Sequence, residues 1–198
     1  MQPPTDREIL ALHRDAAPTR EAFESVYPHC TLVCEIAEQL FAGLDVDTDL
    51  VRVGALLHDI GVYRLYSPTG ELNTVEYVRH GVLGHELLAD LGFPDPICRF
   101  ASRHTGVGIT RDDVLRQFLP IPVDDYVPGS VEEELVMYAD KFHSKRTPPV
   151  FLTADTYAAS VGRWGEDKVT AFATLRAKYG EPVLGPLSEA TGYAVLSK

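Results

Sequence analysis

The stretch from Leu50 to Gly61, LVRVGALLHDIG, constrains the fold more than any other part of the chain. It predicts a helix that is apolar on most sides and that ends in the adjacent side chains His58 and Asp59. Burying an imidazole and a carboxylate costs considerable free energy unless they are paired or bound to a metal. Gly61 is expected to end the helix, because glycine accepts the left-handed cap conformation. The stretch therefore indicates either a buried metal-binding pair or a solvated His-Asp pair at a helix end.

Composition limits the functions that the chain can serve. With 198 residues, 45% of them hydrophobic, the chain can form one domain with a real core, with or without an extension. The net charge of −11 argues against a general binder of nucleic acid or of membrane surfaces. We find no secretory signal and no apolar run near the roughly 20 residues needed to span a bilayer. The sequence leaves the oligomeric state open.

The three cysteines are sparse and odd in number, which suits a reducing cytoplasm and predicts a cytoplasmic location. Cys30 and Cys34 lie one helical turn apart beside His29, so a thiolate metal site is one interpretation. We favour the other, in which they are small side chains on a helix face.

The rest of the chain follows helical spacing, and no segment has a strand pattern that competes with it. Proline and glycine predict loops at 62–73 and 119–130. The expected helices are Asp6 to Asp15, one that starts at Thr19 and is interrupted or kinked at Pro28, His29 to Phe41, His80 to Leu91, Asp95 to Arg103, Thr110 to Phe118, one capped by Ser130, and a long one from Asp155 to Tyr179.

Six side chains with metal-binding capacity lie at or inside these helices beside apolar neighbours. They are His29, His58, Asp59, His80, His104 and Asp140. Each histidine alone could be a hydrogen-bonded core residue, but the set offers nitrogen and oxygen ligands of the kind that suit Fe, Mn, Zn, Ni or Co better than Ca. His13 and His143 have polar neighbours and are expected to face solvent. His80 and His85 are five residues apart and diverge by about 140° on a helix, so we do not expect them to share a metal.

The order of His29, then His58-Asp59, then Asp140 resembles the HD superfamily of metal-dependent phosphohydrolases, and HDIG at 58–61 is a variant typical of one branch. Four further stretches are similar to an uncharacterised HDIG-containing family of small prokaryotic proteins: HGVLGHELLADLGF (80–93), RHTGVGIT (103–110), DYVPGS with EEE (125–134) and YADKFHSK (138–145). The resemblance implies an all-α fold, an HD-domain helical bundle with a metal site in its core. It also implies a single HD domain over 1–198, with a core at about 20–146 and a C-terminal helical extension at about 147–198.

The resemblance also assigns roles to residues. It implies a divalent transition metal, one or two ions per chain, with Fe or Mn favoured and Zn, Ni, Co and Mg as alternatives. The first ion would bind His29, His58, Asp59 and Asp140, and the second would bind His80 and His104, with Asp59 as the bridge. A metal-bound hydroxide would then attack phosphorus in line.

Catalytic roles are expected for Asp59, His85, Arg103 and Lys141. Arg103, Lys141 and Lys145 are candidates to hold phosphate oxygens, and His85 is a candidate proton donor to the leaving group. The alternatives are surface salt bridges for the three cations and an ordinary core or surface histidine for His85.

The resemblance thus implies a phosphohydrolase for a small phosphomonoester or phosphodiester, with a nucleotide-like substrate favoured. Two other functions stay open from the sequence. The histidine separations of 22 and 24 residues also suit HD-type oxygenases with a mixed-valence di-iron pair. A non-enzymatic sensor of a nucleotide or metal is the third hypothesis.

Overall fold

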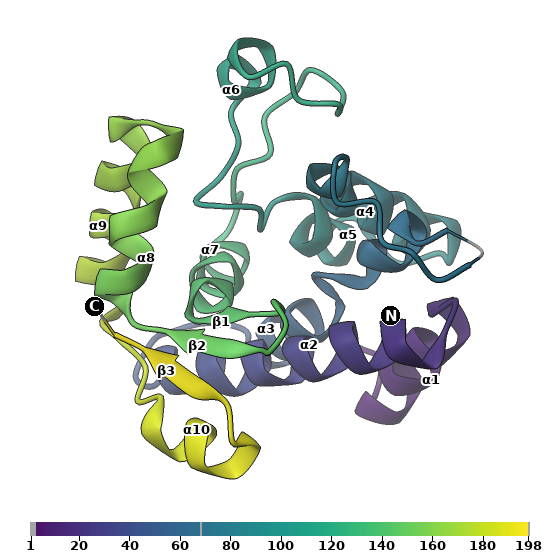
Figure 1. Ribbon diagram of the computed structural model, residues 1–198, viewed down its shortest axis with the longest axis horizontal. Helices are drawn as coiled ribbons and strands as arrows, with labels where there is room; N and C mark the ends of the chain where they lie inside the picture. Colours follow the sequence, from purple (N-terminus) through teal and green to yellow (C-terminus); the bar gives the residue numbers. More distant parts are fainter. Residues whose placement is uncertain (1–2, 68, 198) are drawn as a thin grey trace.

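The computed structural model of the protein describes residues 3–67 and 69–197 and is mostly helical, which confirms the predicted all-α class (Figure 1). The α-helices are α1 (Asp6–Ala16), α2 (Arg20–Leu40), α3 (Thr48–Leu57), α4 (His80–Asp90), α5 (Asp95–Ser102), α6 (Arg111–Arg116), α7 (Val131–Ala139), α8 (Ala154–Val161), α9 (Glu166–Tyr179) and α10 (Gly185–Thr191). The 3-10 helices are η1 (Ile60–Leu65), η2 (Tyr77–Arg79), η3 (Asp140–Phe142) and η4 (Gly162–Trp164). None of these described helices is both long and apolar enough to cross a bilayer.

The long helix α2 packs against α3 and α7 and forms the base of the bundle (Figure 1). It begins at Thr19, whose side chain accepts a hydrogen bond from the backbone N–H of Ala22 (3.1 Å). The helix runs through Pro28 without interruption, so the predicted interruption is wrong, and the alternative of a kink at Pro28 stays a prediction. Proline removes one backbone donor, but the buried faces on both sides of it, including Val26 and Cys30, hold the helix by tertiary packing.

The segment after α3 differs from the sequence-based prediction. α3 ends at Leu57, and the chain continues as the buried 3-10 helix η1 where we expected a loop over 62–73; Pro68 lies outside the described residues. Gly61 is not a left-handed cap, because its φ is not positive. A Cβ at Gly61 would lie 2.1 Å from the backbone oxygen of His80 and 2.2 Å from the nitrogen of Gly84. Gly61 therefore allows η1 to touch the backbone of α4.

A small sheet contradicts the expectation that the chain has no strands. Its strands are β1 (His143–Ser144), β2 (Val150–Leu152) and β3 (Ala194–Leu196). β1 pairs antiparallel with β2, and β2 pairs parallel with β3. Strands of two or three residues are too short to produce a readable alternation of apolar and polar side chains.

The predicted long helix over 155–179 is two helices, α8 and α9, with η4 between them. The break falls at Gly165, whose φ of 134° no helix allows. Tyr138 of α7 is buried against this segment, where its hydroxyl donates to the backbone oxygen of Gly180 (2.7 Å) and its ring packs against Phe172 and Tyr179. The C-terminal residues therefore cover the bundle; the domain boundary near residue 146 stays a prediction.

His13 is fully buried, so the prediction that it faces solvent is wrong. Its Nε2 donates to the backbone oxygen of Leu56 (2.8 Å), and its Nδ1 lies 3.0 Å from the hydroxyl of Tyr63. These two partners satisfy the ring inside the core, and burial lowers the pKa of His13 to about 4.

We expect His13 to make folding sensitive to acid. Its folded pKa of about 4 lies below its ordinary value of 6.5, so its stabilising effect is complete above pH 6.5 and is lost as the pH falls towards 4. Chemical denaturation of the wild type and of His13→Gln at pH 7.5 and pH 5 measures the change in the free energy of unfolding between the two pH values. The wild type should lose about 2 kcal/mol more than the variant over that interval. Equal losses would contradict the assignment.

Candidate metal centre

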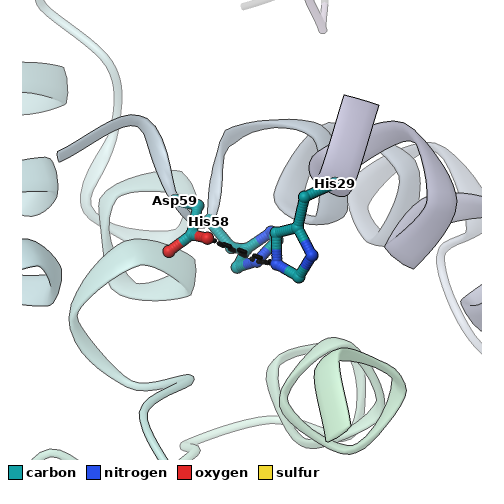
Figure 2. Close-up of side chains that lie close together, drawn as sticks. All are labelled: His29, His58 and Asp59. Atoms are coloured by element: carbon teal, nitrogen blue, oxygen red, sulfur yellow. Dashed lines mark hydrogen bonds and ion pairs between the residues drawn. The ribbon is translucent and has the colours of Figure 1, made fainter. Parts of the chain in front are cut away.

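The six predicted ligands meet in the core although they come from distant parts of the sequence. His29 lies within α2, His58 ends α3, Asp59 follows it, His80 begins α4, His104 follows α5, and Asp140 ends α7. Figure 2 shows His29, His58 and Asp59 pointing towards one another from two segments of the chain. Five of the six side chains are almost completely buried, and Asp140 is partly exposed. The predicted convergence is therefore present in the structure.

The first group of ligand atoms surrounds the Nε2 atom of His29. This atom lies 3.2 Å from Nε2 of His58, 3.2 Å from Oδ2 of Asp59 and 3.0 Å from Oδ1 of Asp140. Nε2 of His58 lies 3.6 Å from each of the same two carboxylate oxygens. Two imidazoles and two carboxylates thus face a common point.

The second group faces the other oxygen of Asp59. Oδ1 of Asp59 lies 3.5 Å from Nε2 of His80 and 3.4 Å from Nε2 of His104, and these two nitrogens are 3.0 Å apart. One carboxylate therefore offers a separate oxygen to each group, which is the arrangement that a bridging ligand requires.

Local hydrogen bonds fix which nitrogen of each ring carries the proton. In three of the four ligand histidines, Nδ1 lies within hydrogen-bond distance of the carbonyl three residues earlier. These pairs are His58 with Ala55 (2.7 Å), His80 with Tyr77 (2.6 Å) and His104 with Ala101 (2.7 Å). A carbonyl only accepts, so Nδ1 must hold a hydrogen and Nε2 of the neutral ring has a free lone pair. Burial lowers the pKa of His104, and it lowers that of His80 to about 3, which keeps these two rings neutral.

These lone pairs face one another and the carboxylates, and neutral imidazoles in this tautomer cannot hydrogen-bond to each other through Nε2. In addition, Oδ1 of Asp59 is buried and has no hydrogen-bond partner among the described residues. A cation between the nitrogens and the carboxylate oxygens would satisfy all of these atoms. The nitrogen and oxygen donors therefore fit a divalent transition metal.

Two lysines compensate the charge of the carboxylates. Nζ of Lys145 contacts Oδ2 of Asp59, and Nζ of Lys141 donates to Oδ2 of Asp140 (2.6 Å) and to the backbone oxygen of His104 (3.1 Å). Burial alone would lower the pKa of Lys145, but the attraction of Asp59 outweighs it and raises that pKa. Both lysines line the cavity above the centre, where a phosphate group could reach them.

His85 and Arg103 point elsewhere. Nδ1 of His85 lies 3.1 Å from the hydroxyl of Ser102, and a guanidinium nitrogen of Arg103 lies 3.7 Å from a carboxylate oxygen of Glu133. Neither residue lines the cavity above the centre, as far as the chain is described. Their contacts agree with the alternatives of a partnered histidine and a salt bridge, and their catalytic roles stay predictions.

His143 is a member of the site that the sequence did not indicate. It is buried, contrary to the predicted exposure, and its Nδ1 lies 2.7 Å from Nδ1 of His29. If Nε2 of His29 is a ligand atom, Nδ1 of His29 donates to His143, which plays the part that backbone carbonyls play for the other rings. The polar neighbours of His143 in the sequence led to the wrong prediction. Its burial comes from tertiary contacts, since β1 pairs with β2 and the ring packs against Phe151 and Tyr193.

Tyr77 also lines the cavity and was assigned to no role from the sequence. It stands one turn before His80 and packs against that ring at 4.8 Å between centroids. This helical spacing is a signal that could have identified it. Cys30 and Cys34 are buried free thiols, and no metal-capable group within the described residues includes a cysteine, in line with the favoured interpretation.

We expect the protein to bind two Mn²⁺ ions per chain and His80→Gln to bind one, because the substitution removes a ligand of the second group only. Elemental analysis and calorimetric titration of chelator-treated protein measure the stoichiometry. His13→Gln is the matched control, since it replaces a buried histidine outside the cluster and should keep both ions. Two ions in His80→Gln would refute the second position.

Replacing His143 should weaken metal binding although it leaves every proposed ligand residue unchanged. We expect His143→Phe to raise the dissociation constant of the ion at His29 about 10- to 100-fold, the usual effect of losing an outer partner of a metal-bound histidine. Competition with a chromophoric chelator gives the constant. An unchanged constant would mean that His143 serves packing only.

The chain is similar in sequence to a known domain family and to several known proteins. The HD domain family matches residues 26–145. An uncharacterised protein of Methanocaldococcus jannaschii is 39% identical over 130 residues, which span 62% of this chain and 70% of that protein. A tRNA (cytidine(56)-2'-O)-methyltransferase of Picrophilus torridus is 35% identical over 126 residues, and one of Thermoplasma volcanium is 33% identical over 112 residues. These segments span 64% and 57% of this chain, but only 33% and 30% of the two methyltransferases.

Solved structures share the fold. The HD domain of the Listeria monocytogenes phosphodiesterase PgpH in complex with cyclic-di-AMP has a TM-score of 0.51 and 19% identity, covering 89% of this chain and 99% of that one. A second structure of the same domain has a TM-score of 0.52 and 17% identity, covering 97% and 90%. The family match extends over more than half of the chain and includes all six residues of the cluster. The chain therefore belongs to the HD domain family.

Proposed function

We propose that the protein is a metal-dependent phosphohydrolase that cleaves a small phosphomonoester or phosphodiester, with a nucleotide-like substrate favoured. The observation that carries this proposal is the position of Asp59, which offers one carboxylate oxygen to each of two groups of imidazole nitrogens. Membership of the HD domain family supports it. Bound metal ions at such a centre supply a water of lowered pKa and polarise the phosphoryl oxygens.

The ligand roles in this proposal follow the two groups of atoms. His29, His58, Asp59 and Asp140 would hold the first ion, and His80 and His104 would hold the second with Asp59 as the bridge. Fe and Mn are the favoured metals, because imidazole and carboxylate ligands suit both. The buried free cysteines support the prediction of a reducing, cytoplasmic environment.

Three further side chains of the cavity would bind and orient the substrate. Lys141 and Lys145 are buried cations beside the carboxylates and would hold phosphate oxygens by charge-assisted hydrogen bonds. Burial raises the pKa of Tyr77, so its phenol keeps its proton at neutral pH. Tyr77 is therefore a better-placed donor of a hydrogen bond to the leaving group than His85, which does not line this cavity.

The first test is release of phosphate or nucleotide from a broad panel of phosphoesters, with Mn²⁺ or Fe²⁺ and with a chelator as control. A cyclic dinucleotide belongs in the panel, because a structural relative was solved with cyclic-di-AMP. We expect chelator-sensitive cleavage of one class of phosphoester, and its loss in Asp59→Asn because that variant removes the bridging charge. No cleavage by metal-loaded protein, together with iron-dependent oxygen consumption, would replace the proposal by the oxygenase hypothesis. Silence in both assays would favour the sensor.

Lys145 provides a second prediction. We expect Lys145→Met to lower kcat/KM about 100-fold, the usual effect of removing one charged group that stabilises developing negative charge, with both metal ions retained. Lys178→Met is the control, because Lys178 is a half-exposed lysine of α9 paired with Glu134. Equal activities in the wild type and Lys145→Met would remove Lys145 from the substrate site.

A further inference from the structure

The cavity above the centre is larger than a phosphate group requires. Its volume is about 440 Å³, which falls within the range of roughly 300–1,000 Å³ found for small-molecule sites. Its floor contains ligand residues of the centre, among them Asp59, His80 and His104, together with Lys141 and Lys145. If the proposed function is correct, the phosphoryl group lies on this floor, and the organic part of the substrate must fill the remaining volume.

The outer part of the cavity has a different chemistry. Its lining includes apolar side chains from three separate segments, Val107 and Ile109, then Leu119, then Val161 and Trp164, beside the polar side chains of Gln117 and Arg163. The apolar side chains of the outer part would favour a substrate whose organic group presents an apolar face to them. A small polar alcohol such as glycerol would leave this surface unused.

One side of this outer part comes from beyond the residues that match the family. The match ends at residue 145, whereas Tyr157, Val161, Arg163, Trp164 and Lys168 also line the cavity. We name this segment, residues 157–168, the C-terminal wall. A site built only from the family core would lack this side.

A buried ion pair holds the C-terminal wall against the opposite rim. Nζ of Lys168 donates to Oδ2 of Asp113 (2.5 Å) and to the backbone oxygen of Gly108 (2.9 Å). Burial alone would raise the pKa of Asp113, but its bonds with Lys168 and Thr110 lower that pKa to about 2, so the pair stays charged. The wall is therefore fixed relative to the loop at 105–109, which follows the ligand His104.

Trp164 is the residue of the wall best suited to recognise a flat group. It is half-exposed at the rim, and the guanidinium of Arg163 lies over its ring at 5.1 Å. An indole offers a large π face, and stacking of a base on an aromatic side chain is tolerant of which base is bound.

We propose that the C-terminal wall determines which phosphoesters the site accepts, and that Trp164 stacks on a flat, apolar group of the substrate about the size of a purine. This assignment rests on the proposed function for the position of the phosphoryl group. It makes Trp164 a specificity-determining residue and leaves the cleavage step to the centre.

The chain contains a single tryptophan, so its fluorescence reports on this position directly. Adenosine monophosphate and ribose 5-phosphate are matched probes, because they share the sugar and the phosphate and differ only by the purine. In titrations of the Mn²⁺-loaded protein, excited at a wavelength that the purine does not absorb, we expect saturable quenching by adenosine monophosphate and none by ribose 5-phosphate.

Variants then measure the contribution of the ring. By equilibrium dialysis, Trp164→Ala should raise the dissociation constant of adenosine monophosphate about tenfold, and Trp164→Phe should restore most of the affinity. Binding of ribose 5-phosphate should stay the same in all variants. Val183→Ala is the control, because Val183 is an exposed apolar residue of the C-terminal segment that does not line the cavity.

Equal affinities of the two probes, no binding of adenosine monophosphate, or an unchanged constant in Trp164→Ala would each overturn the proposal. The phosphoester panel separates this result from the proposed function. If the protein cleaves a phosphoester and the Trp164 variants have no effect, the role of the C-terminal wall is wrong and the phosphohydrolase proposal stands. If a purine binds through Trp164 but no phosphoester is cleaved, the role of the wall stands and the phosphohydrolase proposal is wrong.

Discussion

The fold of the centre holds lone pairs face to face although they repel one another, and the binding of a cation depends on this arrangement. Nε2 of His80 and Nε2 of His104 are 3.0 Å apart, and both rings carry their proton on the far side. Oδ1 of Asp59 faces the same nitrogens and is buried without a donor among the described residues. Such an arrangement is unfavourable in isolation and becomes favourable with a divalent cation between the atoms. Packing of the surrounding helices therefore stabilises a site whose own polar atoms would otherwise separate.

Most ligand rings are oriented by hydrogen bonds to nearby backbone groups, whereas the packing of distant helices brings the ligands together. His58, His80 and His104 each use the carbonyl three residues earlier to fix the ring, so the backbone turn that carries a ligand also selects its tautomer. His29 lies in the middle of α2, where the carbonyls are already bonded within the helix. It takes its partner from His143, on the strand that follows Asp140.

This division explains how much could be predicted from the sequence. Apolar periodicity predicted most of the helices. The order of His29, His58-Asp59 and Asp140 predicted four residues of the cluster, and the family resemblance added His80 and His104, because residue types and their order along the chain are enough to recognise them. The burial of His13 and His143 could not be predicted, since it depends on Tyr63 and on a strand of two residues. The contribution of Trp164 to the cavity also depends on tertiary packing, because Lys168 reaches Asp113 across 55 residues of sequence.

Gly61 shows how a position without a ligand atom can set the distance between the two groups of ligands. Its missing side chain lets η1 touch the backbone of α4 at His80, where a Cβ would lie 2.1 Å from the carbonyl oxygen. A larger residue at position 61 would force η1 and the start of α4 apart, which would change the distance between Asp59, just before η1, and His80, the first residue of α4. The fourth letter of HDIG thus lets the segment that follows His58 and Asp59 lie directly on the start of α4, so the spacing between the two groups of ligands depends on a residue that supplies no ligand atom.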